Sequence, residues 1–374
     1  MESVKTAARW VAVATLACAS TLIQAQVKGA GSTFAANLYG TWTRALPQAQ
    51  DTRMDYEPIG SGGGIAALQN KQVDFAGSDR PMPRASLEQH GFVQFPTAVG
   101  GVVIITNLPG IDGARVKLDA QALAEIYLGK LTQWSDPALA RLNPDLTLPR
   151  MPIVPIHRSD SSGTSFVFTS YLSKVHGDFK SAVGVTSTLK VAEGKSGKTS
   201  GEVLKVLQAT PGAIAYLDYA NAHELQLPSA QLKNAWGKFV TSTPDAMQLA
   251  MRAADWEMMM IDQEPTFEMD LTNAGCPGCW PIAAATYVLV PLRGRNANSY
   301  RVLDFFENAL GGGDDMAAKE GYVPLPSKAK NLVLTSMRRW HQTLERSGAG
   351  RPMRRSEETM PTATALALAP RVSD

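Results

Sequence analysis

The chain has 374 residues, and its 36 Lys and Arg against 34 Asp and Glu give a formal net charge of +2. A balance so close to zero argues against a protein that coats nucleic acid. Three cysteines are too few for a disulfide scaffold, and five scattered histidines form no close cluster of metal ligands. The length corresponds to about two domains of ~150 residues, each large enough to fold around its own core.

The first 25 residues have the pattern of a signal peptide. A weakly basic start precedes an apolar run that begins at Trp10 and is shorter than the ~20 residues needed to span a bilayer. Ala17-Cys18-Ala19 and Ile23-Gln24-Ala25 are both possible cleavage sites, and cleavage at either would send the mature chain into an oxidising space; a single anchor helix is the alternative. Cys18 would allow lipid attachment, but Thr15 stands where a lipoprotein signal usually has leucine.

From residue 27 onward, short apolar runs alternate with Gly-rich breaks, as in strands that lead into helices. Helical and strand-like patterns continue to alternate along the chain. We predict helices at about 119–131, 166–175, 302–310 and 328–346, and buried strands at 153–156, 211–219 and 282–291. This alternation favours an α/β fold with mainly parallel sheets. Residues 347–374 show neither periodicity nor aromatic residues and are predicted to form a disordered tail.

Three segments place glycines and hydroxyl residues where a helix begins. They are Gly29–Phe34, Ile59–Gly64 and Arg158–Ser165. Free backbone N–H groups and the positive end of the helix dipole favour an anion at such a position. One such segment alone is an ordinary helix cap. Three in one chain, one of them with an arginine, indicate a site for an oxyanion.

Asp79 ends a strand-like run, where the ligand crevice of an open α/β sheet lies. A carboxylate beside an anion is repulsive unless it accepts a proton from that anion. Hydrogen phosphate carries such a proton, whereas fully ionised sulfate does not. Asp79 is therefore a candidate for discrimination between the two ions, with a plain cap or turn residue as the alternative.

Taken together, the motifs resemble the periplasmic phosphate-binding proteins (PstS type) of the high-affinity phosphate ABC transporter. The resemblance rests on GAGSTF, GSGGG, DFAGSD and HRSDSSGTSFVFTSYL, with the later WPIAAATYVLV and GYVPLP, and covers roughly residues 27–345. It implies an α/β clamshell of two lobes, with two mainly parallel-type sheets flanked by helices and the ligand in the cleft between the lobes. It implies a signal peptide at 1–25, one lobe from 26–102 and 284–346, the other from 103–283, and a tail at 347–374.

The resemblance also assigns the candidate ligands of phosphate. They are Thr33, Phe34 (through its backbone), Ser61, Asp79, Arg158, Ser162, Gly163 and Thr164. Asp160 would hold Arg158 in place. The implied function is capture of inorganic phosphate in the periplasm by a monomer, and its delivery to the transmembrane and ATPase subunits of the transporter. Neither a cofactor, a metal nor a catalytic residue is expected.

Other interpretations of these residues remain open at this stage. The same fold could bind another tetrahedral oxyanion, such as sulfate or molybdate. A phosphatase would need Ser61 or Ser162 activated by a base or a metal, and His157 would point away from Arg158 if it lies on a strand. Arg158 and Asp160 could also be a surface ion pair, which would contribute only ~0–1 kcal/mol to stability.

Two further motifs stand outside this resemblance. Cys276 and Cys279 form a CxxC motif that we interpret as a local disulfide, with a redox site or half a zinc site as alternatives. Residues 194–199 (GKSGKT) resemble a P-loop, but Ala192 stands where the first glycine must be. We interpret this segment as an exposed loop.

Overall fold

The computed structural model describes residues 25–46, 52–254, 260–261, 264–293 and 297–347. The predicted signal peptide and tail lie outside the described residues, apart from Ala25 and Ser347. No helix in the described part of the chain is long and apolar enough to cross a membrane.

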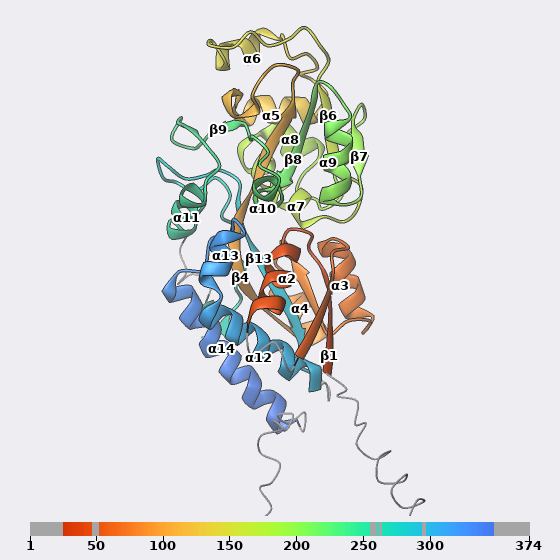
Figure 1. The fold of residues 1–374 in the computed structure, drawn as a ribbon, viewed down its shortest axis with the longest axis vertical. Coiled ribbons are helices and arrows are strands. Elements are labelled where there is room, and N and C mark those ends of the chain that lie inside the picture. The colour runs from red at the N-terminus through yellow and green to blue at the C-terminus, as the bar shows by residue number, and fades with distance from the viewer. Residues whose placement is uncertain (1–24, 47–51, 255–259, 262–263, 294–296, 348–374) are drawn as a thin grey trace, which may run out of the picture.

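A single eight-stranded sheet runs through the molecule in the order β2-β1-β3-β13-β4-β8-β6-β7. Its strands are β1 (Ala25–Gly31), β2 (Thr52–Glu57), β3 (Phe75–Ser78), β4 (Phe92–Asn107), β6 (Val154–Arg158), β7 (Lys195–Gly197), β8 (Ala213–Asp218) and β13 (Ala283–Pro291). We call the part around β1, β2, β3 and β13 the lower lobe, and the part around β6, β7 and β8 the upper lobe, from their places in Figure 1.

Strand direction differs between the flanks of the sheet and its centre. The flanking pairs β1–β2, β1–β3, β6–β7 and β6–β8 are parallel, as expected. In the centre, β13 lies antiparallel to β3 and β4, and β4 lies antiparallel to β8. The predicted strands 153–156, 211–219 and 282–291 correspond to β6, β8 and β13. Their continuous apolar runs fit strands that are covered on both faces.

The long strand β4 belongs to both lobes. Its first part pairs with β13 up to Gly101, opposite Ala283, and its second part pairs with β8 from Val102, opposite Asp218. Trp280 is fully buried beside this change of partner and donates from its indole Nε1 to the carbonyl of Val102 at 2.9 Å. The change supports a lobe boundary near residue 102, although the boundaries given above remain a prediction.

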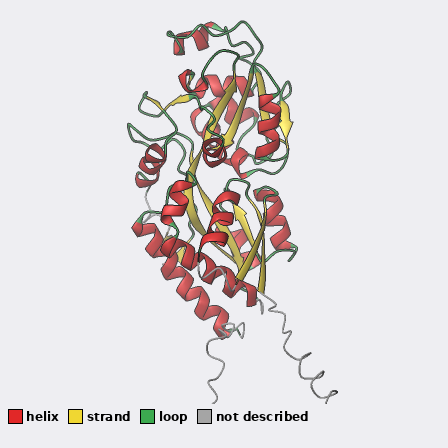
Figure 2. Ribbon diagram, in the orientation of Figure 1, coloured by secondary structure: helices red, strands yellow, loops and turns green. Residues whose placement is uncertain are grey.

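Helices cover the sheet on both faces (Figure 2). Those of the lower lobe are α2 (Ala36–Ala45), α3 (Ser61–Gln69), α4 (Arg84–His90), α12 (Ala297–Gly312), α13 (Asp314–Lys319) and α14 (Ser327–Arg346). Those of the upper lobe and the regions that adjoin it are α5 (Ala120–Tyr127), α6 (Pro137–Leu142), α7 (Gly163–Val175), α8 (Gly177–Ala182), α9 (Ser200–Gln208), α10 (Tyr219–Glu224) and α11 (Pro244–Arg252). The helices predicted from periodicity correspond to α5, α7, α12 and α14.

Short strands complete the fold outside the main sheet. They are β5 (Lys117–Leu118), β9 (Gln231–Lys233), β10 (Phe239–Val240), β11 (Met260–Ile261) and β12 (Glu264–Pro265), with a 3₁₀ helix η2 (Gly113–Arg115). Cys276 and Cys279 form the predicted disulfide just before Trp280. The amide of Asn234, which follows β9, donates to the carbonyls of Cys276, Pro277 and Cys279 at 3.4, 2.9 and 3.3 Å.

The segment 194–199 differs from its prediction. It was expected to be an exposed loop, but Lys195–Gly197 form the edge strand β7 beside β6. Thr199 then caps α9 and accepts a hydrogen bond from the backbone N–H of Glu202. Short polar runs at a sheet edge carry little hydrophobic periodicity, so sequence patterns identify them poorly.

Candidate functional site

The three predicted helix starts meet between the lobes. Thr33 and Phe34 lie in the turn from β1 into α2, and Ser61 is the first residue of α3. From the upper lobe, Ser162 caps α7, and Gly163 and Thr164 are its first two residues. All of them are buried except Thr33, which is partly exposed. Free N–H groups at helix starts are the donors that suit an oxyanion.

Gly163, Ser61 and Asp79 are in close contact across the lobe boundary. A Cβ atom built on Gly163 would lie 2.3 Å from Ser61 Oγ and 2.6 Å from Asp79 Oδ2. The backbone N–H of Asp79 donates to Ser61 Oγ at 3.2 Å. Only glycine fits at the start of α7, because any side chain there would push the two lobes apart.

Arg158 and Asp160 are a buried pair, which excludes the surface-pair interpretation. Their side chains are 2% and 8% exposed, and the guanidinium donates to both carboxylate oxygens, from Nε and Nη2, at 2.7 Å each. Such a two-point contact fixes the plane of the guanidinium. Asp160 therefore fixes the orientation of the Arg158 guanidinium.

Arg158 reaches across the boundary to the lower lobe. Its Nη1 donates to Thr33 Oγ1 at 3.2 Å. A second link joins the start of α3 to the loop ahead of α7, where the backbone N–H of Gly62 donates to the carbonyl of Ser161 at 2.8 Å. The predicted residues of the two lobes thus come together at one place.

Asp79 is 4% exposed and accepts the hydroxyl proton of Ser32, which lies 2.7 Å from both carboxylate oxygens. Burial raises the pKa of Asp79 to about 7, while the bond from Ser32 and the charge of Arg158 act in the opposite direction. Burial also raises the pKa of Asp218, a second carboxyl near Arg158. A carboxyl of this kind is suited to share a proton with a ligand.

Ser61 and Ser162 show no sign of activation as nucleophiles. Ser61 Oγ accepts from the backbone N–H of Asp79, and Ser162 Oγ accepts from that of Ser165 at 3.2 Å. His157 lies on β6 next to Arg158, and burial lowers the pKa of its imidazole. The described residues contain no group of three or more His, Cys, Asp or Glu that could hold a metal ion.

Sequence reasoning missed three residues at this site: Ser32, Ser200 and Asp218. Ser32 also accepts from the backbone N–H of Phe34 at 3.1 Å and so shapes the turn before α2. Ser200 is the first residue of α9, and Asp218 ends β8. The run Thr199-Ser200-Gly201 has the same hydroxyl-and-glycine composition as the three helix starts that were identified, so the signal was present next to the rejected P-loop.

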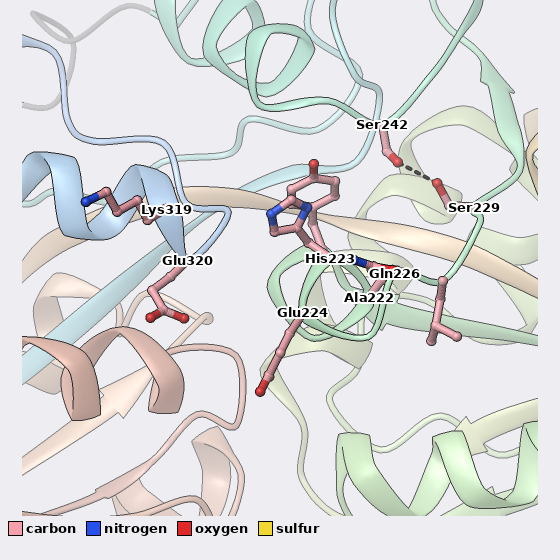
Figure 3. Close-up of a pocket in the computed structure, with 10 residues that line it drawn as sticks. Ala222, His223, Glu224, Gln226, Ser229, Ser242, Lys319 and Glu320 are labelled. Atoms are coloured by element: carbon pink, nitrogen blue, oxygen red, sulfur yellow. Dashed lines mark hydrogen bonds between the residues drawn. The ribbon is translucent and has the colours of Figure 1, made fainter.

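Of two hollows in the described structure, one borders the site. Asp79 lines one of about 550 Å³ that lies between α7 and the start of β13. The other, of about 580 Å³, is lined by His223 and Glu224 of α10 on one side and by Lys319 and Glu320 on the other (Figure 3). None of the predicted phosphate ligands lines this second hollow. We therefore place the site where the helix starts converge.

Comparison with known proteins identifies the family of this chain. A model of the PBP superfamily domain matches residues 17–270. The phosphate-binding protein PstS of Haemophilus influenzae is 38% identical over 320 residues, which cover 85% of this chain and 93% of the relative. The chain belongs to the PstS family. PstS of Xylella fastidiosa is 36% identical over 309 residues, covering 82% and 83% of the two chains.

Solved structures show that this member of the PstS family shares its fold with phosphate-binding proteins. A high-affinity periplasmic phosphate-binding protein, PfluDING, bound with phosphate, aligns with a TM-score of 0.66 at 23% identity over 88% of this chain and all of its own. A phosphate-binding protein from Stenotrophomonas maltophilia aligns with a TM-score of 0.65 at 21% identity, over 83% and 93% of the chains. The two-lobed α/β fold predicted from the motifs is thereby confirmed.

Proposed function

We propose that this chain captures inorganic phosphate between its lobes and delivers it to the transmembrane and ATPase subunits of a phosphate ABC transporter. One observation carries the proposal: in a PstS-family chain, the buried Arg158 and the helix starts of both lobes converge beside Asp79. Neutral N–H and O–H donors with one guanidinium suit a charged tetrahedral ion that must later be released.

The residues divide the work of binding between the lobes. In the lower lobe, Thr33, the Phe34 backbone and Ser61 would donate to phosphate oxygens. From the upper lobe, Arg158 and the start of α7, with Ser162, Gly163 and Thr164, would complete the shell. A hydrogen bond to a charged group contributes ~1.5–3 kcal/mol. Closure of the lobes would bury the ion, and docking on the transporter would open them.

The proposal includes the setting in which the protein acts. Cleavage after Ala25 would release the chain into the periplasm as a monomer, starting at Gln26. Export is supported by PfluDING, a phosphate-binding protein of the same fold that is described as periplasmic. Mass spectrometry of the secreted chain would give its first residue and show whether Cys18 is retained.

Calorimetric titration of the chain from Gln26 tests the function directly. The protein would first be unfolded to strip bound ions, refolded, and checked by circular dichroism. We expect tight one-to-one binding of phosphate and no signal with sulfate. If the folded protein gave no binding signal with phosphate, the proposed function would be overturned.

Asp79→Asn tests whether the site is specific for phosphate or accepts any tetrahedral oxyanion. The amide oxygen of asparagine is an uncharged and weaker acceptor for the phosphate proton, and the amide no longer repels sulfate, so we expect the ratio of phosphate to sulfate affinity to fall. Asp74→Asn is the matched control, because the Asp74 carboxylate lies ahead of the same strand and bonds to the backbone N–H of Lys28 instead. If the ratio of phosphate to sulfate affinity is unchanged in Asp79→Asn, Asp79 does not act as the acceptor of the phosphate proton.

A further inference from the structure

Ser200 sits at the centre of a hydrogen-bond network that joins the lobes. It is 4% exposed, and its Oγ lies 3.0 Å from Thr33 Oγ1 in the lower lobe and 3.3 Å from Arg158 Nη1, which donates to it. Its own hydroxyl proton goes to Asp218 Oδ2 at 3.0 Å. One buried hydroxyl thus contacts two of the predicted phosphate ligands.

The number of available protons shows which group donates in each hydrogen bond of this network. Because a serine hydroxyl has one proton and Asp218 receives it, the Ser200 oxygen acts as the acceptor towards both Thr33 and Arg158. Asp218 is 1% exposed and is held by the backbone N–H and the side-chain amide of Asn221. Asp218, itself held by Asn221, therefore fixes the orientation of the Ser200 hydroxyl.

Arg158 is held from two sides as a result. Asp160 binds its Nε and Nη2, and Ser200, backed by Asp218, binds its Nη1. The guanidinium presents a planar fork of donors, so contacts at both ends determine its rotation as well as its position. Asp160 orients the plane of the guanidinium, and Ser200 adds a further contact at its Nη1 end.

We infer that Ser200, whose hydroxyl is oriented by Asp218, is a positioning residue of the phosphate site: it holds the Nη1 end of Arg158 and the Thr33 side chain in place beside the ion. This inference rests on the proposed function. It adds the start of α9 to the three helix starts that the motifs identified. The capping of α9 falls to its neighbour Thr199, so Ser200 is left available for the site.

The test compares Ser200→Ala with Thr199→Ala. Ser200→Ala removes the oxygen that holds both ligands while alanine remains a good first residue of a helix. We expect its phosphate affinity to fall about tenfold, as for loss of a hydrogen bond to a charged group. Thr199→Ala removes the cap at the same helix end. It is expected to lower the melting temperature and to leave phosphate affinity unchanged.

A double-mutant cycle separates positioning from general stabilisation. In a Thr33→Val background one of the two contacts of Ser200 is already lost, so Ser200→Ala should cost clearly less affinity there than in the wild type. Equal costs in both backgrounds, or wild-type affinity in Ser200→Ala, would overturn the inference while the proposed function stands. Failure of the wild-type protein to bind phosphate would overturn both.

Discussion

Asp79 is a buried carboxyl whose raised pKa links stability to pH. In water a carboxyl titrates near pH 4, whereas burial raises the pKa of Asp79 to about 7. The folded protein therefore holds this proton more tightly than the unfolded chain. The stability associated with Asp79 is fully present below pH ~4 and is lost as the pH rises towards 7.

Asp79→Asn should consequently change the pH dependence of stability. Asparagine carries no charge at any pH. In phosphate-free buffer the free energy of unfolding of the variant should therefore rise relative to that of the wild type between pH 5 and pH 8. Each pKa unit corresponds to about 1.4 kcal/mol, which sets a gain of a few kcal/mol as the upper limit. Urea unfolding across this range measures it, with the exposed Asp145→Asn as the control. A difference that stays constant with pH would contradict the assignment.

Gly163 is one of the residues where the lobes approach each other closely at the site. In Gly163→Ala the added Cβ would meet Ser61 and Asp79, so we expect phosphate affinity to fall at least tenfold with helix content unchanged. Gly201→Ala is the matched control near the start of α9, since its Cβ would meet nothing closer than Thr199 Oγ1 at 3.9 Å. That variant should keep its affinity and gain up to ~1 kcal/mol in stability. Calorimetry and thermal unfolding distinguish the two.

At the scale of elements, much of the structure is readable from local sequence and some of it is not. The starts of α2, α3 and α7 follow from hydroxyl and glycine residues ahead of an apolar face, and β13 follows from its unbroken apolar run. The antiparallel direction of β13 does not, because an apolar run fits either direction when both faces are covered. Ser200 was missed because its role depends on Thr33, which is 167 residues distant in sequence.

The Cys276–Cys279 loop is an element whose contribution can be measured apart from the site. A bridge across three residues closes a very short loop, so the entropic gain is modest, ~2 kcal/mol or less. We expect Cys276→Ser/Cys279→Ser to fold, to bind phosphate, and to lose at most that amount of stability in urea. Asn234→Ala leaves the bridge intact but removes a donor shared by three carbonyls. A loss of phosphate binding in the serine variant would show that the loop does more than brace the chain before Trp280.

At the scale of the molecule, the sixteen residues of β4 tie the two lobes into one sheet. Because β4 belongs to both lobes, unfolding of one lobe would disrupt a strand that also forms part of the other. We expect calorimetry to show one unfolding transition. Phosphate at a hundredfold excess over Kd should raise the free energy of unfolding by about 2.7 kcal/mol and shift the whole transition to higher temperature. Two peaks, of which phosphate moves only one, would contradict this coupling.

The position of β13 also sets the order in which the lobes can be completed during synthesis. All strands of the upper half of the sheet, up to β8, have been made by residue 218, whereas β13 enters between β3 and β4 only at residues 283–291. Until then the lower lobe has two unpaired strand edges, which invite wrong pairing. β3, one of the first strands to be made, is therefore among the last to gain its second neighbour. A chaperone that covers strand edges would be most needed while the residues between β8 and β13 are being synthesised.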